Sequence, residues 1–427
     1  MIERMELYPG IRFSAYTDSR FKQNCLSIQY VRKMDRAEAA MNALIPSVLL
    51  RGTKSARNLR EITLRLDELY GASVSAVSRR AGDYQTTGFY VSLMDDRFAL
   101  EGESVLKKTI SFVKELLFDY PTQQGGFLPE FVEGEKTNQI AAIEAEFNDK
   151  RVYAARQLLE EMCREDPFGI PRMGQSQDVA AITPQGLLQH YLRVRRESPV
   201  QLYYVGSGKP EEVAGSLRDM FASEERAYMP LPEQTELKLS QGRDIREKME
   251  VAQGKLCMGF YTPKTNRTED FAAMQVTNGI FGGDVTSKLF QNVREKQSLC
   301  YSIASSYYSA KGVVLVSAGI DFDKEDHTRQ EILAQLESMR RGGISDAELL
   351  SAKEALISAL RGVHDSPASI EGYYAAMELG GSGLTPQSHT QALEKVTRED
   401  VVRCAKALQL HSTYFLEGGN SDAADGV

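Results

Sequence analysis

An internal repeat constrains the fold of this chain more than any other feature of its sequence. The segment AAMNALIPSVLLRG begins at Ala39, and the similar segment AAMQVTNGIFGG begins at Ala272. Similarity between units of this size indicates that one folding unit has been duplicated. The chain has 427 residues, which is enough for two such units with separate hydrophobic cores. We therefore predict two homologous domains.

Strand-like segments follow the start of the repeat in both halves. YGASVSAVS begins at Tyr70 and CYSIASSYY at Cys300, and a second apolar segment then ends at Asp95 or at Asp321. Their β-branched and aromatic residues alternate with small polar residues, as expected for half-buried antiparallel strands. The strands are grouped rather than alternating with helices. This order predicts an α+β fold, with a mainly antiparallel sheet covered by helices in each domain.

Each half also closes with a capped helix followed by a final strand. Thr183 and Thr397 occupy N-cap positions, and Pro184 fits the first helical turn. Before these caps, apolar residues recur at helical spacing without an internal proline over residues 131–163 and 346–360. We predict helices over both stretches.

The two halves are separated by a polar stretch that contains Pro230 and Pro232 among clustered charges. This composition is typical of a linker. We predict an N-terminal domain over residues 1–225, a linker over 226–245 and a C-terminal domain over 246–427.

Charge and composition argue against several classes of protein. The formal net charge is −8 and the pI is about 5.5, whereas a nucleic-acid partner requires a concentrated basic face. The start, MIERMELYPG, has charges where a signal peptide has an apolar core, and no apolar run is long enough for a membrane helix. We expect a cytoplasmic protein without membrane contact. The five cysteines are scattered and form no C-x-x-C pair, which predicts reduced, packed thiols.

Histidine usage argues against zinc chemistry. The chain has five histidines, and they are His190, His327, His364, His389 and His411. None of them forms the H-x-x-x-H or H-x-x-E-H spacing that places two imidazoles on one face of a helix. We therefore predict no metal ion and no other cofactor.

The segment ALIPSVLLRGT, which ends at Thr53, resembles the zinc-binding helix of the insulinase/pitrilysin family of inverzincin metallopeptidases. That helix carries H-x-x-E-H and runs into a basic residue, Gly and Thr. With Gly52 and Thr53 as anchors, the resemblance places Ala43, Pro46 and Ser47 at the two histidines and the glutamate. A methyl group, a pyrrolidine ring and one hydroxyl cannot replace the roughly three protein ligands of a catalytic zinc. The resemblance therefore implies a chain that is no enzyme by itself.

The third zinc ligand is also replaced. The helix before Asp149 resembles the helix that donates this ligand in the family, and its Glu-Glu pair would fall at Ala141 and Ala142. The RGTK and NDK sequences, together with the vacated site, are similar to bacterial insulinase-like proteins associated with aminopentanol modification of elongation factor P.

A longer motif lies in the second half. FGGDVTSKLFQNVREKQSLCYSIASSYY is similar to the second domain of the compact two-domain processing-peptidase branch of the family. Gly282 and Gly283 match the Gly-Gly turn, while Arg294 and Tyr301 match an Arg and a Tyr that contact substrate. The resemblance implies that this Arg binds a peptide carbonyl and that this Tyr supports an oxyanion. Residue types alone, without the surrounding motif, favour a surface ion pair for Arg294 and a half-buried ring packed in the sheet for Tyr301.

The resemblance implies two alternative functions. In two-subunit members the zinc half comes from one chain and the Arg/Tyr half from its partner, which this chain resembles. We expect a non-catalytic subunit that binds peptide or protein substrate and forms one half of a clam-like chamber. Its partner would be a zinc-bearing homologue in a heterodimer, or a second copy of the chain. The alternative is a stand-alone peptide-binding scaffold, since the strand from Tyr70 to Ser78 matches a sheet edge that accepts substrate as an added strand.

Overall fold

The computed structural model describes residues 2–419, which form two compact units. Unit 1 contains residues up to Glu144, Ile170–Thr235 and Val363–Leu379. Unit 2 contains Ala145–Gly169, Glu236–Gly362 and the residues from Gly380 onward. Each unit thus includes a segment from the other half of the sequence. The boundaries predicted at residues 225 and 246 divide the repeat along the sequence, whereas the compact units are defined by contacts in space. The predicted boundaries of the repeat therefore stay a prediction.

Unit 1 is built on a six-stranded sheet. Its strands are β1 (Ile2–Tyr8), β2 (Ile11–Thr17), β3 (Gln23–Lys33), β4 (Ser73–Ala81), β5 (Tyr84–Met94) and β8 (Val200–Gly206), with a small separate hairpin of β6 (Thr122–Gln123) and β7 (Gly126–Phe127). Its helices are α1 (Ala39–Leu49), α2 (Leu59–Glu68), α3 (Val105–Phe118), most of α4 (Pro129–Asn148), α6 (Ser176–Ala180), α7 (Pro184–Glu197), α8 (Pro210–Phe221) and α12 (Pro367–Gly380).

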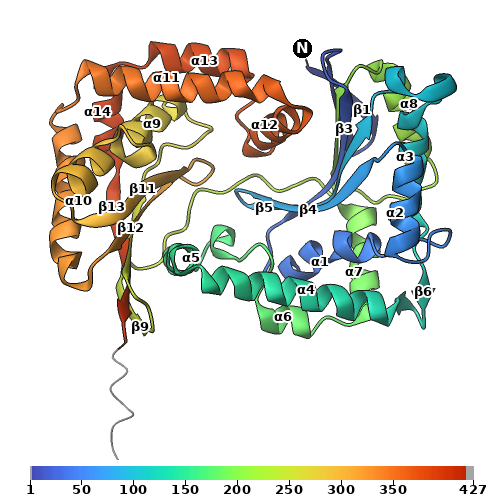
Figure 1. Ribbon diagram of the computed structural model, residues 1–427, viewed down its shortest axis with the longest axis horizontal. Helices are drawn as coiled ribbons and strands as arrows, with labels where there is room; N and C mark the ends of the chain where they lie inside the picture. The colour runs from blue at the N-terminus through green and yellow to red at the C-terminus, as the bar shows by residue number, and fades with distance from the viewer. Residues whose placement is uncertain (1, 420–427) are drawn as a thin grey trace, which may run out of the picture. The chain divides into compact units, whose positions relative to one another are not determined.

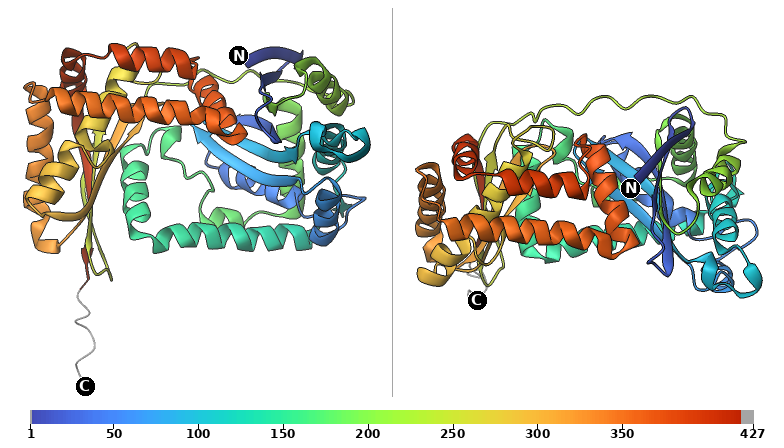
Figure 2. Two further views of the ribbon diagram at one scale, coloured as in Figure 1. Left: turned by 45° about the horizontal axis from the view of Figure 1, so that its top comes forward. Right: turned by 90° about the horizontal axis from the view of Figure 1, so that it is seen from above.

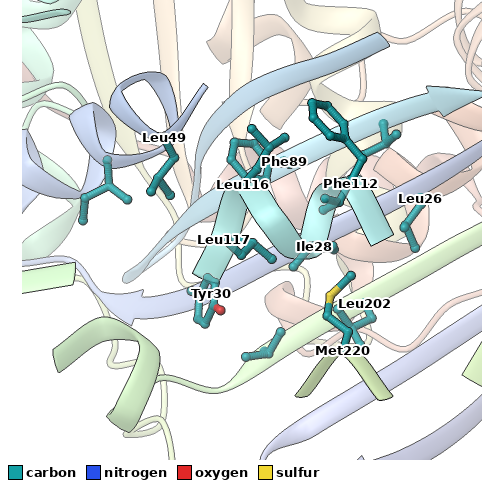
Figure 3. Packing of buried hydrophobic residues seen from close by; sticks show 14 of the residues in the cluster. Leu26, Ile28, Tyr30, Leu49, Phe89, Phe112, Leu116, Leu117, Leu202 and Met220 are labelled. Carbon is teal, nitrogen blue, oxygen red and sulfur yellow. The ribbon is translucent and has the colours of Figure 1, made fainter. Parts of the chain in front are cut away.

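The strand order of this sheet is β1-β2-β8-β3-β5-β4, and only β2 and β8 run parallel. Successive side chains of a strand point to opposite faces. On β3, Leu26 and Ile28 pack with α3, α7 and α8, whereas Cys25 packs with α12. Both faces of the sheet are therefore covered by helices. Figure 1 shows α2, α3 and α7 beside these strands, and Figure 3 shows the packed side chains.

Unit 2 is built on a five-stranded sheet. Its strands are β9 (Asp244–Met249), β10 (Gly254–Tyr261), β11 (Cys300–Tyr308), β12 (Val313–Ile320) and β13 (Gln409–Gly418). Its helices are α5 (Lys150–Met162), α9 (Phe271–Asn278), α10 (Glu325–Arg340), α11 (Asp346–Gly362), α13 (Pro386–Lys395) and α14 (Arg398–Ala407), with π-helical segments η4 (Gly279–Gly283) and η5 (Leu289–Lys296). In both views of Figure 2, α11 and α13 lie side by side.

The two sheets have the same topology. The order in unit 2 is β11-β12-β10-β13-β9, and only β13 and β9 run parallel. This order matches β4-β5-β3-β8-β2 of unit 1 strand for strand, including the single parallel pair. The predicted α+β fold class, with two homologous and mainly antiparallel sheets, is confirmed.

The predicted helix caps are present in both halves. The Thr183 hydroxyl accepts from the backbone N–H of Gly186 at 3.1 Å, and Pro184 begins α7. The Thr397 hydroxyl accepts from Asp400 N–H at 3.2 Å, while the Asp400 carboxylate accepts from Thr397 N–H. These contacts satisfy backbone donors that a helix start leaves without an intrahelical partner.

The helical stretch predicted over residues 131–163 is interrupted at Asp149. This residue caps α5, because its carboxylate accepts from the backbone N–H groups of Arg151 and Val152. The interruption separates α4 from α5, which belongs to unit 2. There α5 packs closely on β10, since a Cβ at Gly259 would lie 2.9 Å from the Met162 sulfur.

Helix α12 has in unit 1 the role that α5 has in unit 2: it comes from the other half of the sequence and packs on the sheet. Ile370 and Tyr374 pack against Cys25 and Tyr203 of the sheet. The buried Glu371 carboxylate accepts from Arg79 of β4 at 2.9 Å through both oxygens. A helix from the second half of the sequence thus completes the core of the first sheet.

Candidate functional site

The positions of the vacated zinc site surround one cavity in unit 1. This cavity has a volume of about 230 Å³. Its lining comes from α1, β4, α4 and the segment just before α6. The lining residues are Ala43, Pro46, Ser47, Ala76, Val77, Ser78, Glu135, Asn138, Gln139, Ala142, Arg172 and Met173. Ala141 does not line it. Of the two positions predicted for the third ligand, the structure therefore brings Ala142 to the site.

The residues in this cavity do not fit a zinc ion. Zinc is bound by imidazole, thiolate or carboxylate groups at about 2 Å. Ala43, Pro46 and Ala142 have no donor atom, and Ser47 offers one neutral hydroxyl. Glu135 is held by Arg51, whose Nε lies 2.9 Å from a carboxylate oxygen. Over residues 2–419, no group of three or more His, Cys, Asp or Glu side chains is arranged to hold a metal ion.

A buried polar network holds α1 behind the cavity. The Asn42 side chain donates to Gln85 at 3.0 Å, and its oxygen lies 2.7 Å from Nε2 of His190 on α7. Arg193 lies 2.9 Å from Nδ1 of His190. Because a guanidinium only donates, Nδ1 accepts and the imidazole is neutral, with its proton on Nε2. The network fixes α1 between β5 and α7.

We expect this histidine to make the protein less stable in acid. Burial, together with the positive charges of Arg193 and Arg32, lowers the pKa of His190 from its ordinary value of 6.5 to about 4, against the opposing effect of the Glu38 carboxylate. The unfolded chain therefore binds a proton that the folded chain does not bind between these two values. The free energy of unfolding should fall as the pH falls from 6.5 towards 4, by about 2 kcal/mol after partial relaxation around the charge.

Urea unfolding at several pH values checks this expectation, with His190→Gln as the comparison because its amide does not titrate. The variant should lose less stability than the parent chain over this pH range. Equal losses would show that His190 does not cause the acid sensitivity.

Strand β4 is one edge of the sheet in unit 1, because it pairs only with β5 within the described part of the chain. Ala81 pairs with Tyr84 across a two-residue loop, in which Gly82 adopts a φ of +59°. The pair that closes such a loop is hydrogen-bonded, and alternate residues point their backbone groups away from the partner strand. Val74, Ala76 and Ser78 hold these outward positions. Arg172 already donates to the Ser78 carbonyl at 3.0 Å.

A second cavity, of about 470 Å³, lies in unit 2 and contains the predicted Arg/Tyr pair. It is lined by Arg294, Glu295, Ser298, Leu299, Cys300, Tyr301 and Lys324. Tyr301 is 60 % exposed, so the ring is not packed in the sheet as its residue type also allowed. Arg294 lies over the ring of Phe290 at 4.5 Å and 3.6 Å from the Glu295 carboxylate. Both side chains are therefore accessible from the cavity.

The turn between η5 and β11 places this pair. Ser298 has a left-handed φ of +51°, and its N–H donates to the Arg294 carbonyl at 3.0 Å. Lys324 donates to the Ser298 carbonyl at 3.2 Å and pairs with Asp321 at 2.8 Å. These contacts join the end of η5 to the end of β12. The sequence did not indicate Ser298 or Lys324, because no local pattern links them to the Arg/Tyr motif.

Electrostatics keep the Tyr301 hydroxyl protonated. It donates to the Asp321 carboxylate at 2.8 Å, and this hydrogen bond raises the pKa of Tyr301. Burial raises the pKa of the neighbouring Cys300 thiol to about 11, which makes it a poor nucleophile. The cavity thus offers a guanidinium and an ammonium as hydrogen-bond donors, and a phenol whose single proton is donated to Asp321.

The two glycines predicted to bind substrate lie outside this cavity. Gly282 is buried in η4, and a Cβ there would lie 2.8 Å from both Leu289 and the Ser305 hydroxyl. Close packing accounts for this glycine. Gly283 does not line the cavity either, and substrate contact at these two positions stays a prediction.

Comparison with known proteins places the chain and its fold in a family. Residues 181–356 match the family described as the Peptidase M16 inactive domain. The chain is 30 % identical over 409 residues to the probable inactive metalloprotease YmfF of Bacillus subtilis, with 96 % of each chain covered. It superposes on a conserved protein of Enterococcus faecalis with a TM-score of 0.90 at 26 % identity and 99 % coverage of both chains. A crystal structure of a peptidase M16 inactive domain from Pseudomonas fluorescens gives a TM-score of 0.81 at 15 % identity and full coverage.

The fold and the vacated site define an inactive homologue of a zinc peptidase. The chain belongs to the M16, or insulinase-like, peptidase family. The predicted family resemblance is confirmed. Between residues 2 and 419, no helix is both long and apolar enough to cross a lipid bilayer.

Proposed function

We propose that the chain is a non-catalytic M16 subunit that binds a peptide or protein segment and pairs with a zinc-bearing homologue. The observation that carries this proposal is the difference between the two cavities. The cavity of the vacated site has no zinc ligand, whereas Arg294 and Tyr301 lie together and accessible in the other. A donor pair of this kind accelerates hydrolysis only when a partner supplies the nucleophile.

The residues of this chain can bind and orient a substrate without metal chemistry. The Arg294 guanidinium can donate to a peptide carbonyl, and Lys324 adds a second positive charge in the same cavity. The protonated Tyr301 hydroxyl can donate to an oxygen that becomes negative during hydrolysis once it turns its proton away from Asp321. Attack on the peptide bond must come from a water molecule activated by the partner's zinc.

A second candidate is a stand-alone peptide-binding scaffold. The free edge of β4 favours it, because backbone pairing with an added strand needs no catalytic side chain. In this function the Arg294 cavity would be a further binding surface with no part in hydrolysis.

Reconstitution distinguishes these functions. The chain is purified alone and after mixing with an M16 homologue from the same organism that retains H-x-x-E-H. We expect the chain alone to contain no stoichiometric zinc and to cleave no unstructured peptide. The mixture should elute as one complex, carry the partner's zinc and cleave peptide faster than the partner alone.

Near-equimolar zinc or cleavage by the washed chain alone would overturn a non-catalytic role. Peptide binding without any complex would leave the scaffold function. Ala43→His, Pro46→Glu and Ser47→His combined should not create activity, because the third ligand is still missing at Ala142.

A further inference from the structure

We propose that the cavity beside α1 holds one apolar side chain of a peptide strand paired with the outer edge of β4. The inference rests on the peptide binding proposed above, and it names the residue class that the chain would select: Leu, Met or Phe. The vacated zinc site would then serve as a pocket that selects the peptide side chain.

The size and lining of the cavity fit such a side chain. An engineered protein cavity of about 150 Å³ binds benzene, and this cavity has a volume of about 230 Å³. Ala43 and Pro46 of α1, Ala76 of β4, Ala142 of α4 and Met173 contribute apolar surface from separate segments. The family resemblance implies a zinc-binding histidine at the position of Ala43, the catalytic glutamate at that of Pro46 and a glutamate at that of Ala142, all larger than the residues found here. Their replacement leaves space for about one aliphatic or aromatic group.

Three charged or polar side chains around the cavity, those of Glu135, Gln139 and Arg172, are already engaged. Glu135 pairs with Arg51 at 2.9 Å. The Gln139 amide donates to the Ala40 and Met173 carbonyls at 3.1 and 2.9 Å. Arg172 donates to the Ser78 carbonyl. A charged peptide side chain would have to break one of these contacts, so the lining favours a neutral and apolar one.

The edge of β4 can bring this side chain to the cavity. Ala76 lines the cavity and also holds an outward position in the strand. A peptide paired with Val74 and Ala76 would place a side chain beside α1, because side chains of a sheet stand roughly perpendicular to it. Arg172 occupies the next outward carbonyl, at Ser78, and therefore limits where the added strand can pair. Figure 1 shows α1 and α4 below β4 in this unit.

A random heptapeptide library tests the proposal without a known ligand. The full-length chain is immobilised and incubated with the library, and the retained peptides are sequenced. We expect Leu, Met or Phe to be enriched at one position. In Ala142→Leu the new side chain fills the cavity, and retention of peptides with these residues should fall about tenfold, as expected for losing the burial of one such group.

Ala141→Leu is the matched control, because Ala141 is exposed on the same helix and does not line the cavity. It should retain the enrichment, and thermal unfolding should show that both variants fold. Ala43→Leu, which fills the cavity from α1, should repeat the loss. Enrichment that survives both filling variants would overturn the pocket while leaving peptide binding intact. No retention above the bare resin would overturn peptide binding itself.

Discussion

Replacing Asp166 by alanine is expected to lower the free energy of unfolding by about 3–5 kcal/mol. Asp166 follows α5, and its carboxylate oxygens lie 3.1 and 3.2 Å from the ammonium of Lys311, which precedes β12. Both side chains are completely buried. The same carboxylate accepts from the backbone N–H groups of Phe168 and Lys238 at 2.9 and 3.0 Å. Its removal therefore leaves a buried positive charge and takes the acceptor away from one buried and one partly buried backbone N–H group.

Urea unfolding followed by circular dichroism measures this loss, and hydrogen exchange of β11 and β12 shows whether unit 2 is affected. Asp166→Asn combined with Lys311→Met should recover part of the stability, because it removes both charges together. Arg341→Ala is the control, since this exposed residue pairs with Glu337 at 2.8 Å. It should cost under about 1 kcal/mol. Equal effects of the buried and the exposed variant would contradict the expected role of the pair.

The repeat and the caps were predictable because they depend on local sequence. Alternating residues in β4 and β11 indicated strands, and the duplication then required the two sheets to share one strand order. Thr183 and Thr397 were recognisable because a cap acts over three residues. The vacated positions were found by family resemblance, and the structure places Ala43, Pro46, Ser47 and Ala142 around one cavity.

The division into compact units was not predictable from the same patterns. Helical spacing shows that α5 and α12 each have an apolar face, but it does not show which sheet will cover that face. The interruption at Asp149 was missed for a related reason. In the sequence, an Asp within a stretch of helical periodicity looks like an exposed residue of one continuous helix. Only the structure shows that the Asp149 carboxylate accepts from backbone N–H groups of the following turn and so starts a new helix.

Long-range polar contacts were equally hidden. Asp166 and Lys311 lie 145 residues apart, and His190 and Asn42 lie 148 residues apart. No spacing rule connects such residues, because only the folded sheet brings them together. Exposed and buried charges also look alike in a sequence, so the sequence did not distinguish these residues from solvated ones.

The second large effect is expected for the Arg/Tyr pair in a complex with a zinc-bearing homologue. Arg294→Ala or Tyr301→Phe should lower kcat for peptide cleavage about a hundredfold. A donor at a developing oxyanion contributes about 3 kcal/mol to transition-state stabilisation. Tyr301 is suited to this role, because the ring is 60 % exposed and its protonated hydroxyl can exchange the hydrogen bond to Asp321 for one to the substrate oxygen. The measurement is steady-state cleavage of an unstructured peptide at saturating partner concentration.

Lys296→Ala separates this effect from a change in general charge. Lys296 and Arg294 are both cations on η5, and Lys296 is exposed while Arg294 is partly exposed. Lys296 does not line the cavity, and its ammonium donates to Asn292 at 2.8 Å. It should leave kcat within about twofold, since an exposed contact of this kind contributes under about 1 kcal/mol. Size-exclusion chromatography must show that every variant still assembles with the homologue. If Arg294→Ala and Tyr301→Phe assemble and cleave like the parent chain, the pair is structural. The free edge of β4 would then be the better guide to what this chain binds.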